Sequence, residues 1–345
     1  MKKFLQRVVL VAVAMATAQV AVAESWRINN DTSKGAHFVD INAAMASELV
    51  KDGDVLYLDP GCVLTTAQTI SKAVTVIGTG WDFSDKPYAY AQISGGVQVN
   101  APAKLLSLYV TNTVYVNVDN IVIERCRVDG DIFNNKKGKI SYLQVLSSYF
   151  YRVRGGYYTS DELYYATISN CIISNGYSDS YGLLNLNNAT ILNNAIVLKG
   201  SSGNCVSGTE NSVLKNNIIM NIYGSRFNLI ESGCSGNTFI NNCLSADSST
   251  AYASANVCMN TKDASTAFLN NGAVGGAAYQ LCEGSPAIGA GEGGIDCGPY
   301  AKGSLYPFVT YGMPKHIPYF TEAAVPAQPT DGKVKVSLKI VNQND

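Results

Sequence analysis

The stretch that decides the fold repeats one short pattern four times: Ile168-Ser-Asn-Cys-Ile-Ile173, Ile191-Leu-Asn-Asn-Ala-Ile196, Leu214-Lys-Asn-Asn-Ile-Ile219 and Phe239-Ile-Asn-Asn-Cys-Leu244. The second member of each central pair falls at positions 171, 194, 217 and 242, so the intervals are 23, 23 and 25 residues. The same frame reaches back to Tyr149 and Cys126, and forward to Asn271. A constant period of this size, in segments rich in β-branched residues, predicts a stack of similar structural units.

The chemistry of the repeat selects the kind of stack. Leucine-rich repeats need a fixed lattice of leucines, and helical repeats need longer periods with apolar residues three and four apart; neither pattern is present. The apolar runs are short and are broken by Asn, Gly and Ser, which is typical of strands and turns. Asn tolerates left-handed backbone geometry at tight bends, and stacked Asn side chains can hydrogen-bond between units. We therefore predict an all-β fold, a parallel β-helix with roughly 22–25 residues per coil.

Residues 1–23 have the pattern of an export signal. An apolar segment spans residues 8–18, and the small residues at 21–23 form a cleavage site. The apolar segment is too short to span a bilayer, and Cys62 is the first cysteine, so no lipid attachment is expected at the cleavage site. We expect a secreted, periplasmic or cell-surface protein with no transmembrane segment after signal removal. The basic residues of the signal are Lys2, Lys3 and Arg7.

The rest of the chain is expected to form one β-helix with additions at both ends. Residues 24–312 would form the β-helix, and residues 40–50 a helix that caps its first coil. Residues 313–345 would form a Pro-rich linker and a final strand over 333–341, either as a cap for the open end or as an export or anchoring signal. Beyond the signal the chain carries 22 basic and 26 acidic residues, which argues against a nucleic-acid partner.

Three segments resemble a known family: Gly53-Asp-Val-Leu-Tyr-Leu-Asp-Pro-Gly61, Ile70-Ser-Lys-Ala-Val-Thr-Val-Ile-Gly78, and Gly284-Ser-Pro-Ala-Ile-Gly-Ala-Gly291 followed by Asp296-Cys-Gly298. They are similar to segments at the start and the end of the pectin-lyase-like right-handed parallel β-helix proteins, notably exported ones from Bacteroidetes. The resemblance covers roughly residues 26–311 and implies a right-handed β-helix and export. It implies little about activity, because that superfamily contains lyases, hydrolases, epimerases and adhesins.

One charged cluster has the residue types for catalysis. Asp129 and Asp131 lie on one predicted coil and Arg152 and Arg154 on the next, so a 23-residue offset stacks Asp129 under Arg152 and Asp131 under Arg154. A lyase acting on uronic acids needs cations for the carboxylate, often Ca²⁺ held by Asp or Glu, and a base with lowered pKa. The alternative is an exposed ladder of structural ion pairs. No other metal or cofactor is predicted, and the two histidines flank the coils, so they provide no Ser/His/Asp site within them.

Tyrosines supply the second functional signal. Nine of them fall within forty residues, between Tyr142 and Tyr181. We predict that a loop after Arg154 presents substrate-binding residues, because aromatic faces beside carboxylates suit sugar rings. Core packing or a protein contact is the alternative. The residues of this predicted site are Tyr157, Tyr158, Asp161 and Glu162.

The sequence leaves three functional hypotheses. The first is an exported, non-catalytic β-helix protein that binds a polysaccharide or has a structural role at the cell envelope. The second is a polysaccharide lyase that acts on uronic-acid-containing glycans. The third is an adhesin or assembly subunit. Cys126 and Cys171 bear on none of them: they lie two coils apart, about 10 Å, which exceeds the reach of a disulfide, so both are expected to be buried thiols.

Overall fold

The structure is a computed structural model. It describes residues 23–81, 90–156, 160–175, 181–198, 204–221, 230–231, 234–244, 258–259, 269, 278–302, 304, 307–308, 319–324 and 337–341. The signal over residues 1–22, the loop residues Tyr157 and Tyr158, and the outlying repeat at Asn271 therefore lie outside the described residues.

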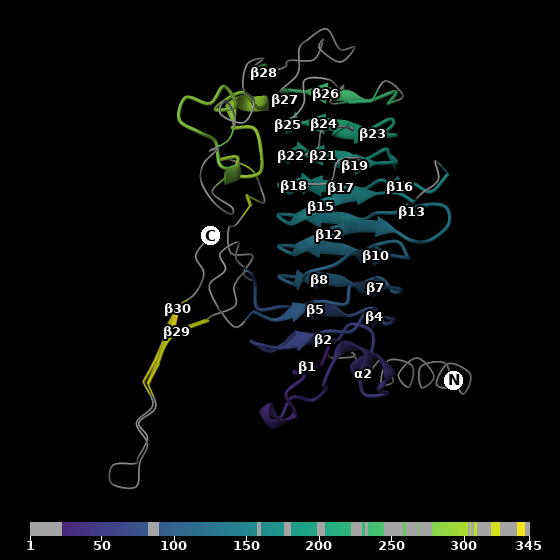
Figure 1. Ribbon diagram of the computed structural model, residues 1–345, viewed down its shortest axis with the longest axis vertical. Coiled ribbons are helices and arrows are strands. Elements are labelled where there is room, and N and C mark those ends of the chain that lie inside the picture. Colours follow the sequence, from purple (N-terminus) through teal and green to yellow (C-terminus); the bar gives the residue numbers. More distant parts are fainter. Residues whose placement is uncertain are drawn as a thin grey trace, which may run out of the picture.

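Two long parallel sheets run along the molecule, and a third, short parallel sheet has three strands (Figure 1). Sheet A contains β1 (Ser25–Ile28), β2 (Val55–Leu58), β5 (Thr75–Ile77), β8 (Lys104–Leu106), β11 (Val122–Glu124), β14 (Gln144–Leu146), β17 (Thr167–Ser169), β21 (Thr190–Leu192), β24 (Val213–Lys215) and β26 (Thr238–Ile240). Sheet B contains β3 (Val63–Leu64), β4 (Gln68–Ile70), β6 (Gln92–Ile93), β7 (Val97–Val99), β9 (Tyr109–Val110), β10 (Val114–Val116), β12 (Arg127–Asn134), β15 (Tyr149–Arg154), β18 (Ile172–Asn175), β19 (Leu183–Leu184), β22 (Ala195–Leu198), β23 (Val206–Ser207), β25 (Ile218–Asn221), β27 (Cys243–Leu244) and β28 (Cys258–Met259). Sheet C contains β13 (Ile140–Ser141), β16 (Leu163–Tyr164) and β20 (Leu186–Asn187).

The chain visits the sheets in turn. From β14 in sheet A it passes through β15 in sheet B and β16 in sheet C, and it returns to sheet A at β17. Ile168 pairs with Ile191, and Ile191 pairs with Leu214, so neighbouring strands of sheet A are one sequence repeat apart. The predicted all-β fold with long parallel sheets is confirmed.

The predicted alignment of the repeats needs one correction. Tyr149 pairs with Ile172. The residue that shares the repeat position of Cys171 is therefore Ser148, and Tyr149 lies one place later. Both polar residues of the loop between β14 and β15 are serines, so the Asn signal that marks the frame elsewhere is missing there.

A ladder of buried asparagines follows sheet A. The Asn217 Oδ1 accepts hydrogen bonds from N and Nδ2 of Asn194 at 2.9 and 3.0 Å. The Asn242 Oδ1 accepts from N and Nδ2 of Asn217 at 3.0 and 2.9 Å. The predicted stacking of Asn194 on Asn217 is confirmed. Cys126 and Cys171 are buried, unbonded thiols, as expected, and burial raises the pKa of both to about 12.

Two rows of left-handed residues turn the chain between sheets. The first corner follows the strands of sheet A, and its members with positive φ are Ser107, Arg125, Ser147, Asn170, Asn193, Asn216 and Asn241. The tyrosine corner lies between sheets C and A, and its members are Asn120, Tyr142, Tyr165, Asn188, Asn211 and Gly236. Asn and Gly are the residues that adopt this conformation at least cost.

The N-terminal end of the stack is covered by the helix α2 (Ile41–Ala46). The Asp40 side chain accepts from the N–H of Ala43 at 2.6 Å, and the N–H of Ile41 donates to the buried side chain of Gln68 at 3.0 Å. The helix is shorter than the predicted span of 40–50, and Leu49, within that span, lies beyond the helix and is exposed. Among the described residues, 3₁₀ turns lie at η1 (Thr32–Lys34), at residues 278–279 and at η3 (Glu292–Gly294), and no described helix could span a membrane.

A C-terminal segment, of which residues 278–302, 304 and 307–308 are described, packs beside the first corner. Its Tyr279 hydroxyl donates to Ser174 of β18 at 2.7 Å, and its Phe308 is buried against Trp81. The predicted final strand is present as β30 (Ser337–Val341), but it pairs antiparallel with β29 (Tyr319–Ala324) in a separate sheet rather than capping the long sheets (Figure 1).

Candidate functional site

The predicted charged cluster lies on β12 and β15, but its pairing differs from the prediction. The register of these strands shifts between Val128 and Asp131, so Asp131 lies opposite Arg152. Asp129 therefore does not stack under Arg152. One extra residue in β12, where Asp129 and Gly130 lie opposite Tyr151 alone, is not visible in a repeat read at a constant period.

Asp131 holds both arginines of the next strand. Its two carboxylate oxygens accept from Nε and Nη2 of Arg152 at 2.7 and 2.8 Å. The Arg154 Nε lies 3.0 Å from Oδ2 of Asp131, as the predicted pair requires, and its guanidinium lies 4.2 Å from the ring centre of Phe133. The Asp131 side chain is only 6% exposed, so this carboxylate is enclosed and neutralised by two cations.

Asp129 belongs to a second closed network. Its oxygens accept from Nε and Nη2 of Arg127 at 2.9 and 3.0 Å, and from the Tyr109 hydroxyl at 2.9 Å. Burial, with the charge of Asp129, raises the pKa of Tyr109 to about 12. Both carboxylates of the predicted catalytic cluster are thus bound to arginine. They do not fit a Ca²⁺ site, because a metal would have to displace a guanidinium from each.

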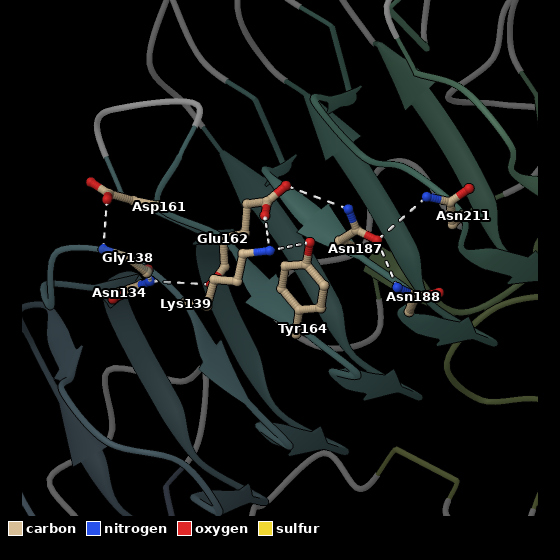
Figure 2. Close-up of polar contacts among 9 residues, drawn as sticks. All are labelled: Asn134, Gly138, Lys139, Asp161, Glu162, Tyr164, Asn187, Asn188 and Asn211. Atoms are coloured by element: carbon tan, nitrogen blue, oxygen red, sulfur yellow. Dashed lines mark hydrogen bonds and ion pairs between the residues drawn. The ribbon is translucent and has the colours of Figure 1, made fainter.

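The base of the predicted sugar-binding loop is held by Asp161. This residue is buried, its carbonyl accepts from the N–H of Gly156 at 2.9 Å, and its Oδ1 accepts from the N–H of Gly138 at 2.7 Å (Figure 2). A side chain at position 156 would collide with the carboxylate of Asp161. The buried Asp161 therefore joins two loops, whereas Tyr157 and Tyr158 lie outside the described residues.

Glu162 belongs to a polar network on the outer side of sheet C (Figure 2). The Lys139 Nζ donates to the Tyr164 hydroxyl at 2.7 Å and lies 3.6 Å from Oε2 of Glu162. The Asn187 Nδ2 donates to Oε1 of Glu162 at 3.4 Å, and the Asn188 Nδ2 donates to Oδ1 of Asn187 at 2.8 Å. The Lys139 side chain is 59% exposed and Asn188 is exposed, whereas Asn187 is buried, so this network presents a cation and one amide to solvent beside the half-buried Tyr164.

Next to this network two tyrosines form an exposed pair. Tyr142 and Tyr165 are stacked, with ring centroids 5.5 Å apart and planes 15° apart, and they are 53% and 50% exposed. The Tyr164 ring meets Tyr165 edge-on at 5.9 Å, which joins the pair to the Lys139 network. We call the pair together with Lys139, Glu162, Tyr164 and Asn187 the tyrosine platform.

The backbone at these two tyrosines is unfavourable. Their φ angles are 62° and 52°, in the left-handed region, at positions that Asn120 and Asn188 occupy in neighbouring repeats. The left-handed conformation costs an ordinary residue about 1–2 kcal/mol. Half-exposed rings recover less burial energy than core residues do. Backbone strain at an exposed side chain is a recognised indication of a functional site.

Sequence reasoning missed the two residues that stand out most. Tyr142 and Tyr165 were visible only as members of a tyrosine-rich region, and Lys139 was not singled out. A signal was present, because both tyrosines lie 22 or 23 residues from an Asn of the same row. A bulky residue in a row of Asn and Gly indicates a position where the fold's preference has been overridden.

Comparisons with known proteins add no functional assignment. No protein-family model, no curated protein and no solved structure matches this chain. The case for a function therefore depends on the geometry of the platform and of the arginine networks.

Proposed function

We propose that this protein is an exported, right-handed parallel β-helix of the pectin-lyase-like kind that binds a glycan on the tyrosine platform without cleaving it. The repeated passage through sheets A, B and C, with strands one repeat apart, supports a β-helix. The basic, apolar and small-residue pattern of residues 1–23 supports export.

The observation that carries the binding proposal is the exposed, strained pair of Tyr142 and Tyr165. Aromatic rings are the protein groups that pack best against the C–H faces of sugars, and a carbohydrate site adds a few polar groups for the hydroxyls. Lys139 and Glu162, joined to the pair through Tyr164, supply a donor and an acceptor of that kind.

Binding without turnover is favoured over lyase activity by the state of the charged groups. Asp129 and Asp131 are each bound to arginine, which leaves them unsuited to a metal. The hydrogen bond to Tyr164 and the nearby Glu162 raise the pKa of Lys139, whereas a lysine base needs a lowered pKa. Lys139 therefore stays protonated at neutral pH and suits binding better than proton abstraction.

Glycan arrays followed by titration calorimetry test the binding. The double variant Tyr142→Asn/Tyr165→Asn places the residue type of neighbouring repeats at both positions. It should bind at least about tenfold more weakly, as expected for the loss of two aromatic contacts of about 1 kcal/mol each. Tyr115→Asn is the matched control, because this tyrosine is partly exposed on sheet B. Unchanged affinity in the double variant would remove the platform from the proposal.

The lyase alternative has its own assay. The protein is incubated with uronate polysaccharides, with and without chelator, and unsaturated sugar ends are measured. We expect no products. Chelator-sensitive products that disappear in Arg152→Ala or Arg154→Ala would replace the proposal with a lyase acting at the arginine cluster.

A further inference from the structure

The buried carboxylate of Asp54 binds the backbone of Glu24, the residue directly before the first strand, β1. The Asp54 side chain lies directly before β2 and is almost fully buried. Its Oδ1 accepts from the backbone N–H of Glu24 at 2.8 Å. Its Oδ2 accepts from Nε1 of Trp26 and from the N–H of Lys51, both at 2.9 Å. The carbonyl of Glu24 also accepts from the N–H of Val55 at 2.8 Å, so both backbone groups of Glu24 are held.

This carboxylate is charged but has no cationic side-chain partner in contact. Burial by itself would raise the pKa of Asp54, but the hydrogen bonds from Lys51, Trp26 and Glu24 lower it below the usual value. None of the ion pairs among the described residues includes Asp54. A buried carboxylate surrounded only by neutral donors is a site prepared for a cation.

The position of Glu24 identifies that cation. It is the first residue after the predicted cleavage site at residues 21–23. We propose that removal of the export signal creates an α-ammonium group on Glu24 that forms an ion pair with Asp54 and fixes the first strand of the stack. The inference depends on the proposed export and is independent of glycan binding.

The chemistry of the step is a simple hydrolysis. Water adds to the Ala23–Glu24 peptide bond, the C–N bond breaks, Ala23 leaves as a carboxylate, and the Glu24 nitrogen takes up protons to become an ammonium. The nitrogen is already 2.8 Å from Oδ1 of Asp54, so a neutral hydrogen bond becomes a charge-assisted one without movement of the strand. A cavity of about 300 Å³ borders the pair and lets the remaining N–H donors reach water.

A processing-dependent order of folding follows. Before cleavage, the nitrogen of Glu24 is a neutral amide and Asp54 lacks its counter-ion, so β1 is held less firmly against β2. After cleavage, the ion pair stabilises the pairing of Ser25 with Val55 at the end of sheet A. The end of the stack would therefore tighten only once the signal has been removed.

The test compares four purified proteins. Two chains begin at Glu24 or at Ala21, so that the second displaces the terminal charge by three residues, and each is made with Asp54 or with Asp54→Asn. At pH 7 the chain beginning at Glu24 should melt about 2–4 °C above the longer chain. In the Asp54→Asn background this difference should vanish. Equal melting temperatures with Asp54 present, or a difference that survives Asp54→Asn, would overturn the proposal.

The proposed ion pair also predicts how the difference in melting temperature between the two chain lengths changes with pH. Pairing with Asp54 raises the pKa of the terminal amine in the folded state, so its stabilisation is complete below the ordinary amine pKa of about 8 and is lost as pH rises through the folded value. The difference between the two chain lengths should therefore shrink in alkaline buffer. A difference that stays constant across that range would contradict an ion pair.

Labelling of the amine gives a readout that does not depend on how well Asp54→Asn folds. In the chain beginning at Glu24, an amine-acylating reagent should modify the terminal nitrogen about tenfold more slowly than the exposed Lys34 after correction with model peptides. Equal corrected rates would refute the ion pair. The mass of the protein exported by cells tests the cleavage separately: any other N-terminus refutes the proposal at its premise and leaves glycan binding untouched.

Discussion

The first corner and the tyrosine corner use the same backbone bend for different purposes. Both are rows of residues with positive φ that recur once per repeat. In the first corner the side chains of Asn170 and Asn241 donate to backbone carbonyls of the C-terminal segment, and Asn216 accepts from the N–H of Glu292. In the tyrosine corner Tyr142 and Tyr165 face solvent.

The difference shows how a repetitive fold separates structure from function. Asn adopts the left-handed bend at low cost and also hydrogen-bonds to neighbouring segments, so a row of Asn stabilises the stack. Tyr adopts the same left-handed bend at a higher conformational cost, and its ring is only partly buried. We therefore propose that the two tyrosines at successive repeats of this row serve binding rather than stability.

The largest predicted effect tests the structural side of this comparison. Asn217→Ala removes the acceptor of two Asn194 donors and the donor to Asn242 and to the Ile191 carbonyl. Each buried group left unpaired costs about 1–3 kcal/mol, so we expect a loss of about 3–5 kcal/mol in the free energy of unfolding. Denaturant titration measures it.

The matched control is an exposed asparagine of the other row. Asn188→Gly keeps a residue that accepts positive φ and removes one hydrogen bond at the surface. Its unfolding free energy should change by less than about 1 kcal/mol. Equal losses in the two variants would mean that burial of the ladder does not distinguish these asparagines.

The next prediction concerns the C-terminal segment that packs beside the first corner. Phe308→Ala removes a buried ring that packs 5.9 Å from the ring of Trp81, and such truncations cost about 3 kcal/mol. The fluorescence emission maximum of Trp81, measured in a Trp26→Phe background, should shift to longer wavelength as the indole becomes exposed to water. Phe38→Ala, beside β1, removes a ring that is not in contact with Trp81 and should leave that emission unchanged, and a shift in both variants would point to global loosening.

Much of the fold could be predicted because its signal is periodic. The interval of 23 residues between Asn194 and Asn217 is enough to place one over the other, since parallel strands in register bring equivalent positions together. The helix cap at Asp40 and the buried thiols of Cys126 and Cys171 follow from local chemistry. Each of these features is set by residues that lie close in sequence or one repeat apart.

The features that sequence could not provide are those that interrupt the period. The register shift before Asp131 moves Arg152 from Asp129 to Asp131, and the contact of Asn170 with Pro299 joins residues far apart in sequence. Neither has a periodic or local signature. The platform is a mixed case: Glu162 was predicted as a ligand residue, whereas the importance of Tyr142 needed the φ angle and the exposed fraction.

The third prediction tests the functional side of the comparison. Replacing both platform tyrosines, Tyr142→Asn/Tyr165→Asn, relieves strain of about 1 kcal/mol per residue and removes ring stacking and burial of similar size. We expect the free energy of unfolding to change by less than about 1 kcal/mol while glycan affinity falls. A loss above about 2 kcal/mol would make the pair a structural ladder like the asparagines.

The smallest expected effect is a flat pH profile of glycan binding. The pKa of Lys139 is raised by its hydrogen bond to Tyr164 and by Glu162, so its charge is complete below the unfolded value of about 10.4 and is lost only as pH rises through the higher folded value. Affinity measured by calorimetry should therefore vary less than about twofold between pH 6 and 9. Lys139→Met supplies the control: it should weaken binding equally at both ends of this range. A wild-type profile with a midpoint near neutrality that Lys139→Met abolishes would instead identify a lysine with lowered pKa, and it would restore the case for proton abstraction at the platform.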